Sequence, residues 1–196
     1  FLRDGVTQIY NMGYAYSPEK DVSPTRSVPW APIINHSNIW WKYYHHLSSY
    51  QARCCYLLRE SQFAPDIAIY SPYANYWAKE VIKGFVSRNM AFENVGRELG
   101  KILVANGYDF DILNEDILLN QATIEDAKIK VRSMEYKFLI LPNVEVISVE
   151  ALEFIRDYVK KGGVVIALEA LPATSGGMED YQNRDQQIET IVKELF

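Results

Sequence analysis

The 196-residue sequence lacks a long hydrophobic run, a cluster of basic residues and a set of spaced cysteines. A membrane-spanning helix needs about 20 mostly apolar residues, and no segment comes near that length. Lys and Arg are scattered singly apart from Lys160-Lys161, and the formal net charge is -5. Since nucleic-acid binding requires a basic surface that neutralises phosphates, we expect neither a membrane span nor a nucleic-acid partner.

The two cysteines, Cys54 and Cys55, are neighbours in a segment that is predicted to be helical. Adjacent side chains on a helix diverge by about 100°, so a disulfide between them is not expected, and the redox compartment stays open. Both cysteines also precede the predicted sheet, whereas an amidotransferase-type nucleophile sits on a sharp turn after a strand. Thiol catalysis is therefore not expected.

Glycine is missing where a phosphate site would need it. A dinucleotide fold carries G-x-G-x-x-G after its first strand, but residues 71–77 of this chain read Ser-Pro-Tyr-Ala-Asn-Tyr-Trp. The acidic segment 109–116 breaks the calcium-loop spacing at Leu113 and lacks the turning glycine, which favours solvated strand ends over a metal site. Adjacent His45 and His46 point apart on a helix and cannot close on one metal. We expect no cofactor and no bound metal.

From residue 61 to residue 196 the chain alternates between strands and helices. Apolar runs, caps and terminating glycines predict strands at 66–70, 110–113, 136–142 and 164–168, and helices at 91–106, 148–161 and 185–196. The continuous hydrophobicity of the third strand is typical of a parallel strand that is covered on both faces. This alternation predicts an α/β domain with a doubly wound, mostly parallel sheet.

Residues 1–60 have a different pattern of predicted elements from residues 61–196. They contain one short strand candidate at 6–10, a proline-punctuated loop over 17–32, and a predicted helix at 39–60 with Ser37 or Asn38 as N-cap. A helical stripe is predicted to face a core: Ile39, Tyr43, Leu47, Tyr50, Cys54, Leu57 and Leu58. Strand, long loop and helix make one βα unit, whose loop belongs to the ligand face in a barrel. A strand so close to residue 1 leads us to expect a fragment.

The segment 35–44 gathers two tryptophans, two tyrosines, a histidine and three small polar residues. A sugar ring needs such a set, because it offers an apolar C–H face for stacking and a rim of hydroxyls for hydrogen bonds. The same residues also serve as large rings packed in a core with satisfied polar tips. Both interpretations stay open from composition alone.

Dispersed motifs resemble large bacterial α-L-rhamnosidases of glycoside hydrolase family 106, over most of the chain. The similar segments are 5–10, 13–18, 35–41, 50–53, 57–58, 66–72, 107–111 and 139–142. The resemblance implies that residues 1–60 are the last βα unit of a catalytic (β/α)8 barrel. It also implies that residues 61–196 form a flavodoxin-like accessory domain, similar to a β-galactosidase trimerisation domain or an inactive class I glutamine amidotransferase.

The resemblance further implies a secreted or periplasmic bacterial hydrolase that acts on plant-type polysaccharide, with a possible homo-oligomer through the accessory domain. The family uses an acid and a base carboxylate, with inversion. Neither can be assigned here, so we expect the catalytic pair upstream and the isolated chain to be inactive. The alternative is a non-catalytic interaction or oligomerisation domain. Candidate carbohydrate contacts, as hydroxyl partners or stacking rings, are Asn11, Tyr14, Trp30, His36, Asn38 and Trp40.

Overall fold

The computed structural model describes residues 6–13, 34–79 and 91–196. It divides the chain into two compact units, Phe1–Phe63 and Ala64–Phe196, which are described separately below. Within the described residues, no helix has both the length and the apolar character that crossing a membrane requires.

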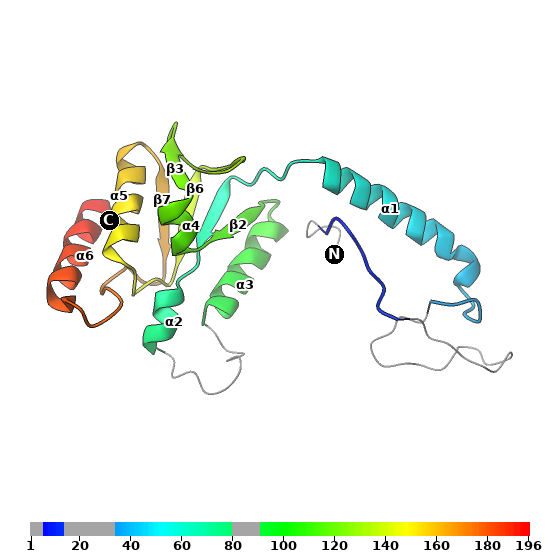
Figure 1. Ribbon diagram of the computed structural model, residues 1–196, viewed down its shortest axis with the longest axis horizontal. Coiled ribbons are helices and arrows are strands. Elements are labelled where there is room, and N and C mark those ends of the chain that lie inside the picture. Colours follow the sequence, from blue (N-terminus) through cyan, green and yellow to red (C-terminus); the bar gives the residue numbers. More distant parts are fainter. Residues whose placement is uncertain (1–5, 14–33, 80–90) are drawn as a thin grey trace. The chain divides into compact units, whose positions relative to one another are not determined.

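The second unit is built on a four-stranded parallel sheet (Figure 1). Its strands are β1 (Ile67–Tyr70), β2 (Phe110–Leu113), β6 (Phe138–Pro142) and β7 (Val164–Leu168), arranged in the order β2-β1-β6-β7. Counting only the parallel strands, this order is 2-1-3-4, which is the beginning of the flavodoxin-like order. The predicted α/β fold with a parallel sheet is therefore confirmed, and each of the four predicted strands is present.

Helices cover both faces of this sheet. On one face, Leu99 and Leu103 of α3 (Ala91–Ala105) pack against Ile67, Ile69 and Ile140. On the other face, a larger core joins β1 and β6 to α4 (Glu115–Asn120), α5 (Val149–Lys160) and α6 (Tyr181–Leu195). Coverage of both faces explains why all four residues of β1 are buried.

The ends of the second unit's helices follow the predicted signals. The Ser148 hydroxyl accepts a hydrogen bond from the Ala151 amide at 3.0 Å, so it caps α5 as expected. Gly107 and Gly162, which follow α3 and α5, have φ angles of +81° and +91° that suit glycine. Only α6 differs, since it begins at Tyr181 and thus four residues earlier than the prediction of 185.

Three elements of the second unit were not predicted. One is a separate antiparallel sheet of β3 (Ala122–Glu125), β4 (Lys128–Val131) and β5 (Met134–Tyr136). The others are the short helices α4 and α2, of which α2 spans Tyr73–Lys79. The small sheet contributes Ile129, Val131 and Tyr136 to the larger core, so it belongs to the same folded unit.

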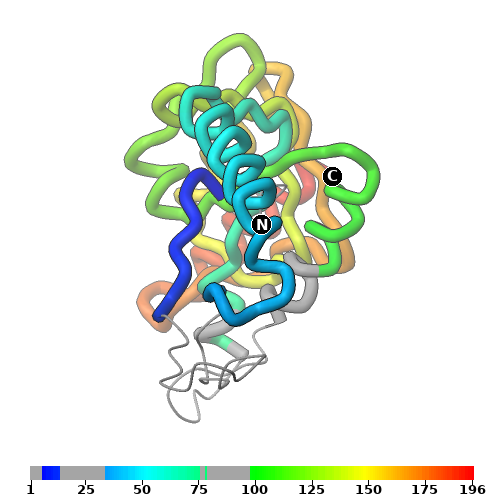
Figure 2. The backbone as a smooth tube through the Cα atoms, turned by 90° about the vertical axis from the view of Figure 1, so that its right-hand side faces the viewer, coloured from blue at the N-terminus to red at the C-terminus, as the bar shows by residue number. Residues whose placement is uncertain are grey.

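The first unit contains a 3-10 turn, η2 (Trp41–Tyr43), that leads into helix α1 (Tyr44–Glu60). The predicted helix start at 39 and the predicted Ser37 or Asn38 cap are wrong, since the residue preceding α1 is Tyr43 and it makes no side-chain cap. Residues 6–10 are not a strand either. They run extended beside α1, as Figures 1 and 2 show, and no described strand of this unit lies alongside to pair with them.

Most of the predicted core stripe of this helix is exposed, and Cys54 and Leu58 are half-buried. Among the described residues of the unit, none on α1 is buried, and Leu47, Tyr50 and Leu57 are 50%, 53% and 66% exposed. The helical period was read correctly, but the described residues of this unit place no second layer over the stripe. An amphipathic helix is stable only when its apolar face is covered.

Candidate functional site

Three rings make up the aromatic cluster of the first unit: Trp40, Trp41 and Tyr44. Trp41 stacks on Tyr44, with ring centroids 5.8 Å apart and planes only 9° from parallel. Trp40 approaches the same tyrosine at 5.9 Å with a tilt of 52°. Each tryptophan is still about two-fifths exposed, at 39% and 40%, so the rings support one another and leave apolar surface for a ligand.

Local turn chemistry holds this cluster in place. The Asn35 side chain accepts a hydrogen bond from the Ser37 amide at 2.9 Å, and the Asn38 side chain accepts one from the Trp40 amide at 3.4 Å. The Trp41 amide then donates to the Asn38 carbonyl at 3.0 Å. Asparagine favours such turns because its side chain bonds to the backbone two residues ahead. The polar residues of this segment therefore position Trp40 and Trp41 directly before α1.

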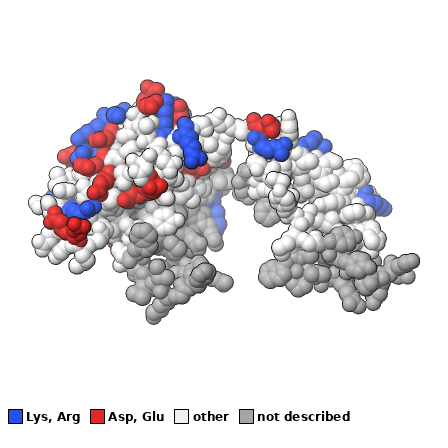
Figure 3. Space-filling model, viewed as in Figure 1, with Lys and Arg blue, Asp and Glu red and all other residues white. Residues whose placement is uncertain are grey.

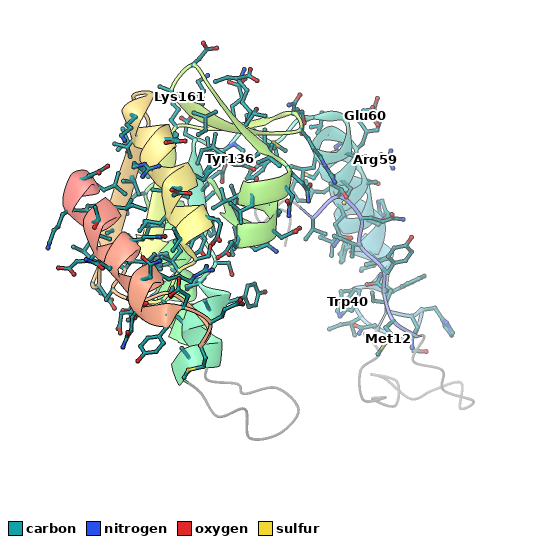
Figure 4. All side chains as sticks on the ribbon, turned by 60° about the vertical axis from the view of Figure 1, so that its left-hand side comes forward. Met12, Trp40, Arg59, Glu60, Tyr136 and Lys161 are labelled. Carbon is teal, nitrogen blue, oxygen red and sulfur yellow. The ribbon has the colours of Figure 1, made fainter. Side chains whose placement is uncertain are left out.

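An amide from the extended segment joins the aromatic cluster. Asn11 donates a hydrogen bond from Nδ2 to the Tyr44 hydroxyl at 3.2 Å. At the opposite end of the helix, the Cys55 thiol lies 3.9 Å from the Val6 carbonyl oxygen, so the segment follows α1 along its length. Figure 4 shows Met12 beside Trp40 at one end of α1, with Arg59 and Glu60 at the other.

The aromatic cluster has the chemistry of a sugar-binding surface. Exposed ring faces can stack on a pyranose, and the Asn11 amide and Tyr44 hydroxyl lie beside them as hydrogen-bonding groups. The charged side chain in segment 35–44 is Lys42, whose ammonium group lies 4.9 Å from the centroid of the Tyr43 ring, and Figure 3 shows few coloured side chains over the described part of this unit. The surface therefore suits a neutral ligand better than an ionic one.

The structure brings some of the predicted contact residues together. Asn11 and Trp40 meet through Tyr44, and Asn38 bonds to the backbone of Trp40. His36 is exposed in the turn that precedes the cluster. Tyr14 and Trp30 lie outside the described residues. Trp41 and Tyr44 were not among the candidates, although both belong to the segment 35–44 that pointed to a sugar.

A pair of catalytic carboxylates is absent from the described part of the first unit. Its one acidic residue there is Glu60, which is exposed and lies 3.4 Å from the Arg59 guanidinium. The described residues of both units also contain no group of three or more His, Cys, Asp or Glu that could hold a metal ion. The aromatic cluster therefore presents exposed rings and neutral polar groups, and the described residues of its unit include no pair of carboxylates.

Several residues of the acidic segment 109–116 of the second unit make structural contacts. Asp111 accepts a hydrogen bond from the Tyr136 hydroxyl at 2.8 Å, and Glu115 accepts one from the Tyr70 hydroxyl at 2.9 Å. Asn114 caps α4 by accepting from the Ile117 amide at 2.9 Å. These oxygens have different protein partners and do not converge on one point.

The turn after β1, which would carry phosphate in a nucleotide-binding relative, is occupied by Asn75. This side chain is buried and donates to the Asn143 carbonyl at 2.5 Å. Its oxygen accepts from the amides of Glu145 and Val146 at 3.1 Å and 2.5 Å. The place where the strand order reverses, between β1 and β6, is thus filled by the protein's own amide.

Comparison with known proteins relates the chain to carbohydrate-active enzymes. The model of glycoside hydrolase family 106, described as alpha-L-rhamnosidase, matches residues 1–196. A putative beta-glucuronidase of Formosa agariphila is 25% identical over 190 residues, which are 96% of this chain and 14% of that protein.

A solved structure shares the fold of the chain. The rhamnosidase of Novosphingobium sp. PP1Y matches with a TM-score of 0.55 and 17% identity, over 90% of this chain and 16% of that one. A beta-galactosidase of Bifidobacterium adolescentis matches with a TM-score of 0.41 and 19% identity, over 66% of this chain and 53% of that one. The chain therefore spans about one-seventh of the length of the putative glucuronidase and about one-sixth of the rhamnosidase chain.

Proposed function

Because the chain belongs to glycoside hydrolase family 106, the alpha-L-rhamnosidases, we propose that its aromatic cluster binds a sugar residue of a plant-type polysaccharide within a longer glycoside hydrolase. The observation that supports this proposal is the pair of partly exposed tryptophans beside the Asn11 amide and the Tyr44 hydroxyl. An apolar ring face next to neutral polar groups matches the two sides of a sugar ring.

In this proposal the first unit is the last βα unit of a (β/α)8 barrel, and its extended segment 6–10 becomes a strand only when strands of the longer protein pair with it. The exposed apolar stripe of α1 supports this assignment, because the outer helices of a barrel bury one face against neighbouring polypeptide. We also propose that the protein works in the periplasm or the extracellular space, because a plant-type polysaccharide substrate lies outside the cell. The second unit then follows the barrel as a non-catalytic domain.

The isolated 196-residue chain is proposed to be inactive. The carboxylates of residues 1–60 are Asp4, Glu19, Asp21 and Glu60, and the sequence marks none of them as the acid or the base that inverting hydrolysis needs. Incubation with 4-nitrophenyl α-L-rhamnoside tests this point. We expect no release of nitrophenol above a buffer control. Clear turnover would contradict the proposal that the catalytic carboxylates lie outside this chain.

Binding is tested separately by NMR titration of the same chain with methyl α-L-rhamnoside. We expect saturable shifts of the Trp40 and Trp41 indole signals. Trp40→Ala should weaken binding about tenfold if the ring stacks on the sugar. The control Tyr56→Ala removes a ring on α1 that is 58% exposed and should leave the affinity unchanged. A lower melting temperature with unaltered binding would show that Trp40 packs instead of binding.

A second function, self-association through the second unit, is favoured by the exposed apolar residues of the edge strand β7. This strand lies at the edge of the sheet, and its Val164 and Ile166 are 44% and 40% exposed. Sheet edges are normally protected by charge or proline, yet residues 162–168 carry neither. Antiparallel pairing of two copies about Ile166 would set the Ile166 residues of the two copies opposite each other.

Sedimentation of the wild-type chain and two lysine variants tests this association. Ile166→Lys should give a monomer where the wild type forms a dimer, because the two introduced lysines would lie opposite each other across the paired strands and repel. Ile102→Lys, at a 60% exposed position of α3, should leave the dimer intact. A wild type that stays monomeric at all concentrations would contradict the proposal.

A further inference from the structure

The carboxyl ends of the parallel strands open into a groove on the second unit. The groove has a volume of about 740 Å³, within the range of small-molecule sites. Its walls come from the segments that follow all four strands: α2 after β1, α4 after β2, Ser148 after β6, and Gly176-Gly177 after β7. In open α/β sheets this edge is where ligands bind. No residue of the groove belongs to the aromatic cluster.

The lining combines an aromatic and apolar wall with a neutral and acidic rim. Tyr73 is 46% exposed and Leu119 is 40% exposed, while Asn114, Asn120 and Asp116 supply polar groups. Among the described residues that line the groove, none is Lys or Arg. Phosphate and other anions are therefore poor ligands for it.

Contacts within the protein fix several of these polar groups in advance. The Glu115 carboxylate accepts from the buried Tyr70 hydroxyl at 2.9 Å, and the Asp116 carboxylate accepts from the Asn120 amide at 2.8 Å. The Ser148 hydroxyl uses an acceptor position for the α5 cap, which leaves its O–H to donate. Groups that are held before binding lose little freedom when a ligand arrives.

We infer that this groove is a second carbohydrate site, which binds a neutral saccharide between the Tyr73 ring and the polar rim of α4. Carboxylate and amide oxygens accept hydrogen bonds from sugar hydroxyls, and the Tyr73 and Leu119 side chains cover a C–H face. The site rests on residues of the second unit alone. Its ligand class agrees with the family, but the site does not depend on sugar binding by the aromatic cluster.

An NMR titration of the full chain with the methyl glycosides of L-rhamnose, D-galactose and D-glucose tests this inference. At least one of them should give saturable shifts of the Asn114, Asn120 and Gly176 signals, with a Kd of about 1 mM. Shifts of the Trp40 and Trp41 indoles report the aromatic cluster in the same spectra. Each site can therefore fail while the other binds.

Two tyrosine variants sharpen the test. Tyr73→Ala should raise the Kd about tenfold. The matched control Tyr181→Ala removes a tyrosine of equal exposure, 45%, that does not line the groove, and it should bind like the wild type. If Tyr73→Ala does not fold, Asn120→Ala takes its place, because it releases Asp116 from its partner.

Three results would overturn the inference. The first is the absence of saturable shifts in the groove with all three glycosides. The second is a response to putrescine but to no sugar, which would make the groove a site for cations. The third is an equal loss of affinity in Tyr73→Ala and Tyr181→Ala, which would remove the assigned role of the Tyr73 ring.

Discussion

The hydroxyl of buried Tyr70 donates a hydrogen bond to Glu115 Oε2 at 2.9 Å and so ties the end of β1 to the first turn of α4. Burial raises the pKa of the Tyr70 phenol well above its ordinary value, and the neighbouring Glu115 charge and hydrogen bond add to the shift. Burial likewise raises the pKa of Tyr136, with a contribution from its hydrogen bond to Asp111.

These raised pKa values predict a loss of stability at alkaline pH. An unfolded tyrosine loses its proton near pH 10, while Tyr70 in the folded protein keeps its proton. The unfolded state then binds fewer protons, so the free energy of unfolding is fully retained below about pH 10 and falls above it. The limiting slope is about 1.4 kcal/mol per pH unit for one tyrosine.

Urea unfolding at a series of pH values measures this slope. Tyr70→Phe should lose about 1 kcal/mol at neutral pH but should decline less steeply above pH 10. The exposed control Tyr181→Phe should follow the wild-type curve. Identical alkaline slopes for Tyr70→Phe and the wild type would show that the Tyr70 phenol does not control the transition.

Asn75 should be a large contributor to the stability of the second unit. Its buried amide satisfies the Asn143 carbonyl and two backbone amides beyond β6. Asn75→Ala leaves these groups without a side-chain partner, and we expect a loss of about 3 kcal/mol in the free energy of unfolding, measured in urea. The exposed Asn183→Ala on α6 should change it by less than about 0.5 kcal/mol. Similar losses in both variants would contradict the assigned role of Asn75.

The main sheet could be predicted because its signals are local and consistent. β1 and β6 are uninterrupted apolar runs, and Ser148 and Gly162 mark the ends of α5 in ways that depend only on neighbouring residues. The sheet of β3, β4 and β5 was missed because charged residues interrupt the apolar pattern of its short strands. Its first turn places Asp126 and Ala127 at φ angles of 50° and 59° without the Asn-Gly pair that marks such turns.

The candidate site could be predicted only in part. The residues of segment 35–44 could be singled out as candidate sugar contacts, since they are contiguous and chemically distinctive. The contact between Asn11 and Tyr44 spans 33 residues, and no periodicity reports a pairing across such a loop. The exposed stripe of α1 shows a related limit: an amphipathic pattern predicts that a face will be covered but does not identify what covers it.

Lys130 is predicted to lower the pKa of one carboxylate of the small sheet, Glu125, more than that of another, Glu135. Its ammonium group lies 3.1 Å from Glu125 and 3.3 Å from Glu135. The hydrogen bond from Lys130 is the largest cause of the lowered pKa of Glu125, whereas Lys128 is the largest cause for Glu135. Lys130→Met should therefore return the pKa of Glu125 towards its ordinary value and leave that of Glu135 still lowered. NMR titration of the side-chain carboxyl carbons measures both, and equal changes at the two sites would refute the assignment.

A methyl group at Gly163 should destabilise the second unit. Gly163 follows α5 directly before β7, and a Cβ atom there would overlap the ring of Tyr158, which is fully buried and donates to the Lys137 carbonyl at 2.5 Å. Because the ring can move only by losing that bond and its packing, Gly163→Ala should cost about 2 kcal/mol or more in urea unfolding. Gly176→Ala is the matched control, since its Cβ would meet atoms no nearer than 3.9 Å. A Gly163→Ala protein as stable as Gly176→Ala would mean that the Tyr158 ring is not held where it lies.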